Sequence, residues 1–172
     1  MIPKAGQQHL RELVRSFDAL RGLHEQLFAV LEAKIEAMRT ANVPVLQTVN
    51  QDEHAILVGL REKESQRASL MQALARECGM SAKAARSATV SQITPLLPDV
   101  ERELLLNAAS RLQLIVARTA QANRIAATIA RQVTHHMKFV FSALRPACTG
   151  PVGYTLRGES FVANPAIMDV VG

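Results

Sequence analysis

The sequence is poor in aromatic residues and has no tryptophan. Aromatic residues make up 3% of the 172 positions, although hydrophobic residues make up 48%. The core must therefore consist of Leu, Ile, Val, Ala and Met, a composition typical of a helical bundle rather than a β-sandwich. The sequence also lacks the roughly 18 consecutive apolar residues that cross a bilayer, and its N-terminus lacks the features of a signal peptide. We therefore expect a cytoplasmic protein without membrane insertion.

The residue patterns of enzymes and metal sites are absent from the sequence. Cys78 and Cys148 match no metal-binding spacing, so we interpret them as reduced structural thiols. No glutamate has a histidine three residues later, as di-iron bundles require, and the adjacent His135 and His136 diverge by about 100° on a helix. Phosphate-binding glycine loops and nucleophile elbows are also missing. We predict no enzyme activity, no metal, no cofactor and no small-molecule substrate.

Two long amphipathic helices are predicted in the first half of the chain, over about residues 8–40 and 45–77. Asn42 can cap the second helix and Pro44 suits its first turn, so we expect the chain to reverse there, with a kinked continuous helix as the alternative. Gly79 stands where the end of a helix favours glycine. The apolar positions of these helices are Leu10, Leu13, Phe17, Leu20, Leu27, Leu31, Leu46, Val49, Ile56, Leu60, Leu70, Met71 and Leu74.

Two polar features interrupt these apolar stripes. His24 fills the slot between Leu20 and Leu27 in the first helix. In the second helix, the stripe is interrupted by Lys63, Glu64 and Arg67. A polar layer of this kind can fix the register of packed helices, as polar core positions do in coiled coils.

A short connector and a much longer third helix follow. Residues 81–98 are small and polar, and Pro95 and Pro98 restrict this segment to one or two helical turns. Neither glycine nor proline occurs between Pro98 and Pro146, so a helix from Asp99 to Leu144 is predicted. It would be close to 70 Å long, against about 50 Å for each earlier helix, so we expect it to extend beyond its partners.

The sequence thus predicts an all-α fold: an antiparallel long-helix bundle of three main helices and a short helical connector, with an irregular C-terminal tail. We assign the bundle to residues 1–145 and the tail to residues 146–172, where glycines and prolines alternate with large apolar residues. Such a tail either packs on the bundle as a strand-like arm or becomes ordered on a partner.

The charge pattern of the third helix is one-sided. No acidic residue occurs between Glu103 and Glu159, and the net charge of the chain is +5. The stripe either binds phosphates or an acidic protein, or is a solvated face partly neutralised by Asp18, Glu25 and Glu32 of the first helix. The scarcity of aromatic residues argues against nucleic acid as the main ligand. The stripe consists of Arg111, Arg118, Arg124, Arg131, Lys138 and Arg145.

With its helices placed, the chain resembles the FlgN family of flagellar export chaperones. The second helix has leucines around Lys63-Glu64 and Arg67, closed by Gly79, and residues 89–132 resemble the family's threonine-led turn, proline and leucine-rich third helix. Asn123 matches a characteristic asparagine, although Ala120 stands where a second one is often found. The resemblance extends to Tyr154 and Gly158 of the tail.

The resemblance implies a cytosolic chaperone that holds the C-terminal helical segments of hook-filament junction proteins and delivers them to the type III export apparatus. Its partners would be flagellar hook-associated proteins and export-gate components, and the chain itself would be a monomer or a weak homodimer. A structural coiled-coil adaptor is the main alternative, followed by an RNA-binding bundle that uses the arginine stripe.

We predict the client-binding site at the end of the third helix and in the tail. The final helical turns stay apolar where the helix extends beyond its partners, which suits an amphipathic partner helix. The alternative is that the tail or a second copy of the chain covers this face. The single tyrosine, Tyr154, is the best candidate for a binding hot spot. The predicted client-binding residues are Met137, Val140, Phe141, Leu144, Tyr154 and Phe161.

Overall fold

The computed structural model describes residues 4–148, 153–154 and 160–161, with side chains described for residues 6–143. These residues belong to two compact units, Met1–Ala127 and Thr128–Gly172. The helix α5 (Asp99–Cys148) contributes to both units. Within the described residues, no helix combines the length and the apolar character that a membrane span needs.

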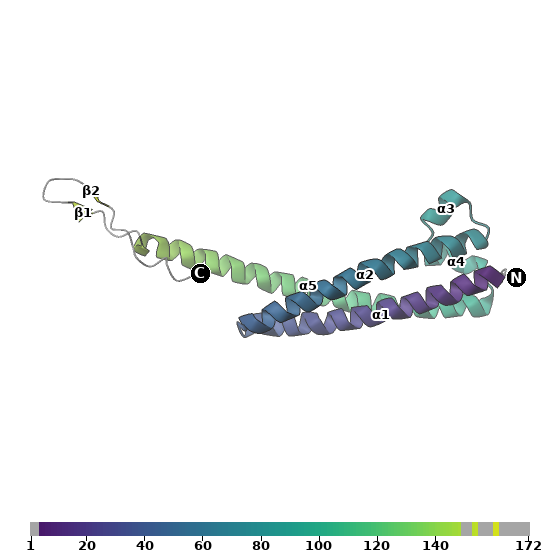
Figure 1. The fold of residues 1–172 in the computed structure, drawn as a ribbon, viewed down its shortest axis with the longest axis horizontal. Coiled ribbons are helices and arrows are strands. Elements are labelled where there is room, and N and C mark those ends of the chain that lie inside the picture. The colour runs from purple at the N-terminus through teal and green to yellow at the C-terminus, as the bar shows by residue number, and fades with distance from the viewer. Residues whose placement is uncertain (1–3, 149–152, 155–159, 162–172) are drawn as a thin grey trace. The chain divides into compact units, whose positions relative to one another are not determined.

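The first unit is a bundle of long helices, and this confirms the predicted all-α fold. Helices α1 (Lys4–Arg39) and α2 (Val43–Glu77) run antiparallel, and the first part of α5 lies along them (Figure 1). The predicted connector contains two short helices and a 3₁₀ turn, α3 (Ala82–Arg86), α4 (Val90–Ile93) and η1 (Thr94–Leu96).

The reversal between α1 and α2 shows that they are two helices rather than one kinked helix. Ala41 has a positive φ of 52°, and the backbone N–H of Asn42 donates to the carbonyl of Ala37 at 2.9 Å. Asn42 also caps α2, because its side chain accepts a hydrogen bond from the backbone N–H of Val45. Pro44 stands in the first turn, as predicted. Asn42 therefore closes one helix and opens the next.

The end of α2 confirms the role expected of glycine there. Gly79 has a φ of 85°, and its N–H donates to the carbonyl of Arg76 at 2.9 Å. The N–H of Met80 donates to the carbonyl of Ala75 at 3.0 Å, which completes a Schellman motif. Ser81 then caps α3, since its side chain accepts from the N–H of Ala84.

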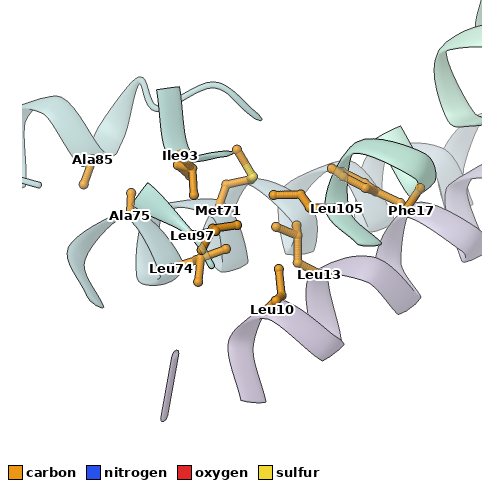
Figure 2. Close-up of a cluster of buried hydrophobic side chains, with 11 residues drawn as sticks. Leu10, Leu13, Phe17, Met71, Leu74, Ala75, Ala85, Ile93, Leu97 and Leu105 are labelled. Carbon is orange, nitrogen blue, oxygen red and sulfur yellow. The ribbon is translucent and has the colours of Figure 1, made fainter. Parts of the chain in front are cut away.

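Two apolar clusters form the core of the first unit. The first joins the beginning of α1, the end of α2, the connector and the beginning of α5; most of its residues are labelled in Figure 2. The second joins the later part of α1 to Leu60 of α2 and to Ala122 and Ala126 of α5. The predicted apolar positions of α1 are all buried: Leu10, Leu13, Phe17, Leu20, Leu27 and Leu31.

The polar layer of α2 is half-buried rather than part of the core. Arg67 Nε donates to Glu64 Oε2 at 2.7 Å, and Lys63 pairs with the neighbouring Gln66. The pKa of His24 is lowered by burial, an effect that the nearby Glu64 carboxylate opposes. His24 Nδ1 is buried and has no hydrogen-bond partner. Burial therefore favours the neutral form of His24, and the Glu64 carboxylate of the polar layer partly offsets this effect.

Helices α1 and α5 are connected by polar contacts as well as by the core. The hydroxyl of Thr119, which is 5% exposed, donates to the carbonyls of His24 at 3.2 Å and Ile115 at 2.9 Å. Arg111 lies 3.9 Å from Asp18, and Arg118 stacks over the ring of Phe28 at 4.7 Å. These contacts fix the position of α5 against α1 within the first unit.

The second unit contains the rest of α5 and two short strands. The helix starts at Asp99, as predicted, but ends at Cys148 rather than Leu144, because Pro146 removes one hydrogen bond without ending the helix at once. Strands β1 (Gly153–Tyr154) and β2 (Ser160–Phe161) pair antiparallel, with Gly153 opposite Phe161. The predicted division into a helical bundle of residues 1–145 and a C-terminal tail of residues 146–172 stays a prediction.

Candidate functional site

The described residues hold no cluster of side chains suited to binding a metal ion. No group of three or more His, Cys, Asp or Glu side chains in residues 6–143 is placed to hold a metal ion. The thiol of Cys78 is half-buried, and its pKa is raised by burial and, to a lesser extent, by the Glu77 carboxylate. A raised pKa makes this thiol a poor nucleophile.

The part of α5 in the second unit presents large apolar side chains to solvent. Met137 is 46% exposed and Phe141 is 63% exposed, while Val140 is half-buried. No side chain between Thr128 and Ala143 is buried. Of the predicted client-binding residues with described side chains, Met137 and Phe141 are therefore exposed and Val140 is half-buried.

These residues belong to an apolar face that begins before Met137. Ile129 and Val133 precede Met137 at intervals of four, and Val140 and Phe141 follow it at intervals of three and four. Residues spaced in this way lie on one side of a helix. We call this the apolar face of α5; it comprises Ile129, Val133, Met137, Val140 and Phe141.

Three of the predicted site residues have side chains outside the described set. Leu144 lies in α5, and Tyr154 and Phe161 lie in β1 and β2, so the structure gives their backbone only. The register places Tyr154 opposite Ser160, the residue before Phe161. The backbone pairing brings the two aromatic positions to neighbouring rungs of one short ladder.

Sequence reasoning missed two exposed apolar features. Phe139, which is 65% exposed, lies two residues from Met137 and therefore off the apolar face. In the first unit, an open groove of about 480 Å³ runs between α1 and α5. The groove is lined by Phe28, Glu32, Ile35, Leu114, Ala117, Arg118, Gln121, Ala122 and Ile125. Leu114 and Ile125 each directly precede a buried residue of α5. Two adjacent apolar residues cannot both face the core of a helix, so these pairs were the sequence signal for an exposed apolar side chain.

The basic stripe of α5 makes different contacts in the first unit and in the second unit. In the first unit, Arg111 pairs with Asp18, as expected, and Arg118 covers Phe28. Glu25 pairs with Arg21 of its own helix rather than with α5. In the second unit, the guanidinium of Arg131 donates to the hydroxyl of Thr128 at 3.2 Å. Neither Arg131 nor Lys138 has a carboxylate partner among the described side chains.

Comparison with known proteins identifies the family. The sequence model of the FlgN protein family matches residues 1–160. The chain belongs to the FlgN protein family. This is a family of flagellar export chaperones, so membership gives the chain a chaperone role in flagellum biogenesis. No curated protein and no solved structure matches the chain.

The structure gives physical reasons for several FlgN-like residues. Leu60, Met71 and Leu74 are core residues of α2, and Gly79 provides the positive φ of the Schellman motif. Asn123 is exposed on α5. The structure gives no physical account of this asparagine.

Proposed function

We propose that this FlgN-family chain binds the C-terminal helical segments of flagellar hook-associated proteins in the cytoplasm and delivers them to export-gate components of the type III apparatus. It acts by binding alone, without a cofactor or a catalysed reaction. The observation that carries the proposal is the apolar face of α5, whose Met137 and Phe141 are exposed in a segment without any buried side chain.

An amphipathic client helix suits this face because both partners would bury their apolar stripes. Side chains at intervals of three and four act as successive anchors in such helix-to-helix recognition. Phe141 and Met137 are the largest exposed side chains of the face, and binding energy at interfaces concentrates on a few such anchors. Tyr154, Phe161 and Leu144 extend the proposed site toward the tail.

The experiment is calorimetric titration of the full chain with the purified C-terminal segment of a hook-filament junction protein. Phe141→Asp is expected to weaken binding by at least about thirtyfold, the loss of a hot spot worth about 2 kcal/mol. The matched control is Val100→Asp, because Val100 is 70% exposed and lies on the same helix in the first unit. Binding that survives Phe141→Asp would contradict the proposed site.

A third variant separates the apolar face from the groove of the first unit. Leu114 lines that groove and is 68% exposed, so Leu114→Asp would block a client that lies there. We expect Leu114→Asp to bind the segment as the unmodified chain does. Loss of binding in Leu114→Asp alone would move the client site to the groove.

The contribution of the tail is tested by truncating the chain after Arg145. We expect the truncated chain to melt normally and to bind the segment less tightly, with Tyr154→Ala and Phe161→Ala reproducing part of the loss. A much lower melting temperature would show that the tail is structural. Normal melting with full binding would place the site entirely outside the tail.

The rival functions predict different behaviour of the purified chain. A structural adaptor would form an obligate homodimer that persists on dilution, whereas we propose a monomer or a weak homodimer. An RNA-binding bundle would bind oligonucleotides with a steep dependence on salt concentration. Dilution on a sizing column and a salt titration with oligonucleotide therefore test the two alternatives.

A further inference from the structure

A basic flank borders the apolar face of α5. Arg131, Thr134 and Lys138 follow one another at intervals of three and four, so they form a row along one side of the helix. Together with Ala130 and His135, they line a shallow open depression. We call Arg131, Thr134 and Lys138 the basic flank.

The charge of the basic flank is not neutralised within the described part of the chain. Arg21, Arg67, Arg102 and Arg111 each lie within 4.0 Å of a carboxylate. Arg131 donates to the Thr128 hydroxyl, and no acidic residue occurs in the sequence between Glu103 and Glu159. Among the described residues, two positive charges therefore stand beside an exposed apolar face without a carboxylate partner.

The charge lies on one side of the apolar face only. At about 100° per residue, Gln132, His136 and Ala143 fall on the opposite side, which carries no lysine or arginine. In paired helices, charges that flank an apolar seam determine partner choice and orientation. Because only one side of the apolar face is charged, the two edges of a bound helix meet different charge environments.

We propose that the basic flank selects client helices whose polar edge beside the apolar stripe is acidic. This inference rests on the proposed function and adds to it the chemistry of the client. The client's apolar stripe packs on the apolar face, and its carboxylates lie beside Arg131 and Lys138. Reversing the helix would place its acidic edge against Gln132 and His136, so the flank also sets its direction.

The same charges disfavour two other occupants of this face. A second copy of the helix would bring like charges together, because residues 104–158 offer no carboxylate. An anionic lipid surface attracts basic amphipathic helices, but it does not require the charge to lie on one side of the apolar face. An acidic-edged protein helix accounts for the one-sided charge.

The test uses synthetic helical peptides that share one apolar stripe and differ only along one edge, which carries Glu, Gln or Lys. Their affinities for the full chain are measured by fluorescence anisotropy. We expect the Glu peptide to bind about tenfold more tightly than the Gln peptide, because two surface ion pairs each contribute modestly. This preference should shrink as the salt concentration rises.

Charge reversal provides the decisive variant. Arg131→Glu with Lys138→Glu should reverse the order, so that the Lys peptide binds most tightly. The matched control is Lys83→Glu with Arg86→Glu, which makes the same change in net charge on the exposed surface of α3 and should leave the order unchanged.

The outcomes separate this inference from the proposed function. If the three peptides bind equally and Phe141→Asp still weakens binding of the junction-protein segment, the charge selection is wrong and the client site stands. If the control reverses the order as well, only net charge matters and the inference is overturned. The third outcome is that the chain binds vesicles of anionic lipid through Arg131 and Lys138 and shows no preference among the peptides. This outcome would overturn the inference and identify lipid as the partner of the basic flank.

Discussion

The two stretches of α5 share a sequence pattern but differ in what they contact. Before Ala127, the stripe is buried at Leu105, Ala108, Ile115, Ala122 and Ala126. From Thr128 to Ala143, the same spacing of three and four continues, yet no side chain is buried. Hydrophobic periodicity therefore shows which side of a helix is apolar, and it does not show whether that side packs within the chain.

The charges of the two stretches differ in the same way. Arg111 and Arg118 have partners on α1, whereas Arg131 and Lys138 meet no carboxylate among the described residues. An apolar stripe with satisfied charges stabilises a fold, and an exposed stripe with unsatisfied charges is suited to a partner. We therefore propose that the first stretch stabilises the fold and that the second stretch binds the client.

The largest expected effect is the loss of stability when a buried apolar residue of the first stretch is shortened. The same change in the second stretch should have little effect. Leu105 is fully buried, so Leu105→Ala should lower the free energy of unfolding by about 2–5 kcal/mol. Met137→Ala removes an exposed side chain and should change the free energy of unfolding by less than about 0.5 kcal/mol. Chemical denaturation measures both, and a large loss in Met137→Ala would show that this face packs within the chain.

A smaller effect is expected at the reversal between α1 and α2. Ala41 has a φ of 52°, a conformation that costs residues other than glycine about 1 kcal/mol or more, so Ala41→Gly should stabilise the first unit by about 0.5–1 kcal/mol. The matched control is Ala29→Gly, an exposed helix-interior position that should lose about 1 kcal/mol. Both are measured by denaturation, and destabilisation by Ala41→Gly would contradict the assigned backbone. Client binding should not change in either variant.

The smallest expected effect is a pH dependence centred on the first unit. Because burial lowers the pKa of His24 below its ordinary value of 6.5, the unfolded chain binds more protons at this residue than the folded chain does. Its contribution to stability is therefore complete above about pH 6.5 and is lost as the pH falls through the folded-state pKa. Melting curves at pH 7.5 and 5.5 should differ less in His24→Gln than in the unmodified chain.

The matched control for this effect is the exposed His54. His54→Gln should retain the full difference between the two pH values. An equal reduction in both variants would show that the difference does not arise from the burial of His24. Binding of the client segment at constant pH should be the same in both variants.

Much of the fold could be predicted from residues that restrict the backbone. Asn42 with Pro44, Gly79 and Asp99 marked helix ends that the structure confirms. The positive φ of Ala41 could not be predicted, because alanine carries no sequence signal for a left-handed conformation. The position of the last helical turn was also missed, since Pro146 removes a hydrogen bond without dictating where the helix ends.

The candidate site was predicted only in part, because exposure depends on which elements pack together. The spacing indicated an apolar face, and Met137 and Phe141 are indeed exposed. The groove beside Leu114 requires α1 and α5 to lie side by side, and a sequence shows no such distance. The pairing of Glu25 with Arg21, rather than with α5, likewise depends on side-chain geometry.

Hydrogen exchange with and without the client segment tests the division of α5 most directly. The free chain should exchange slowly at amides near Leu105, Ile115 and Ala122, and faster between Thr128 and Ala143. Addition of the junction-protein segment should increase protection between Thr128 and Ala143 and leave the earlier amides unchanged. Protection gained around Phe28 and Leu114, with none after Thr128, would contradict the account and place the client in the groove of the first unit.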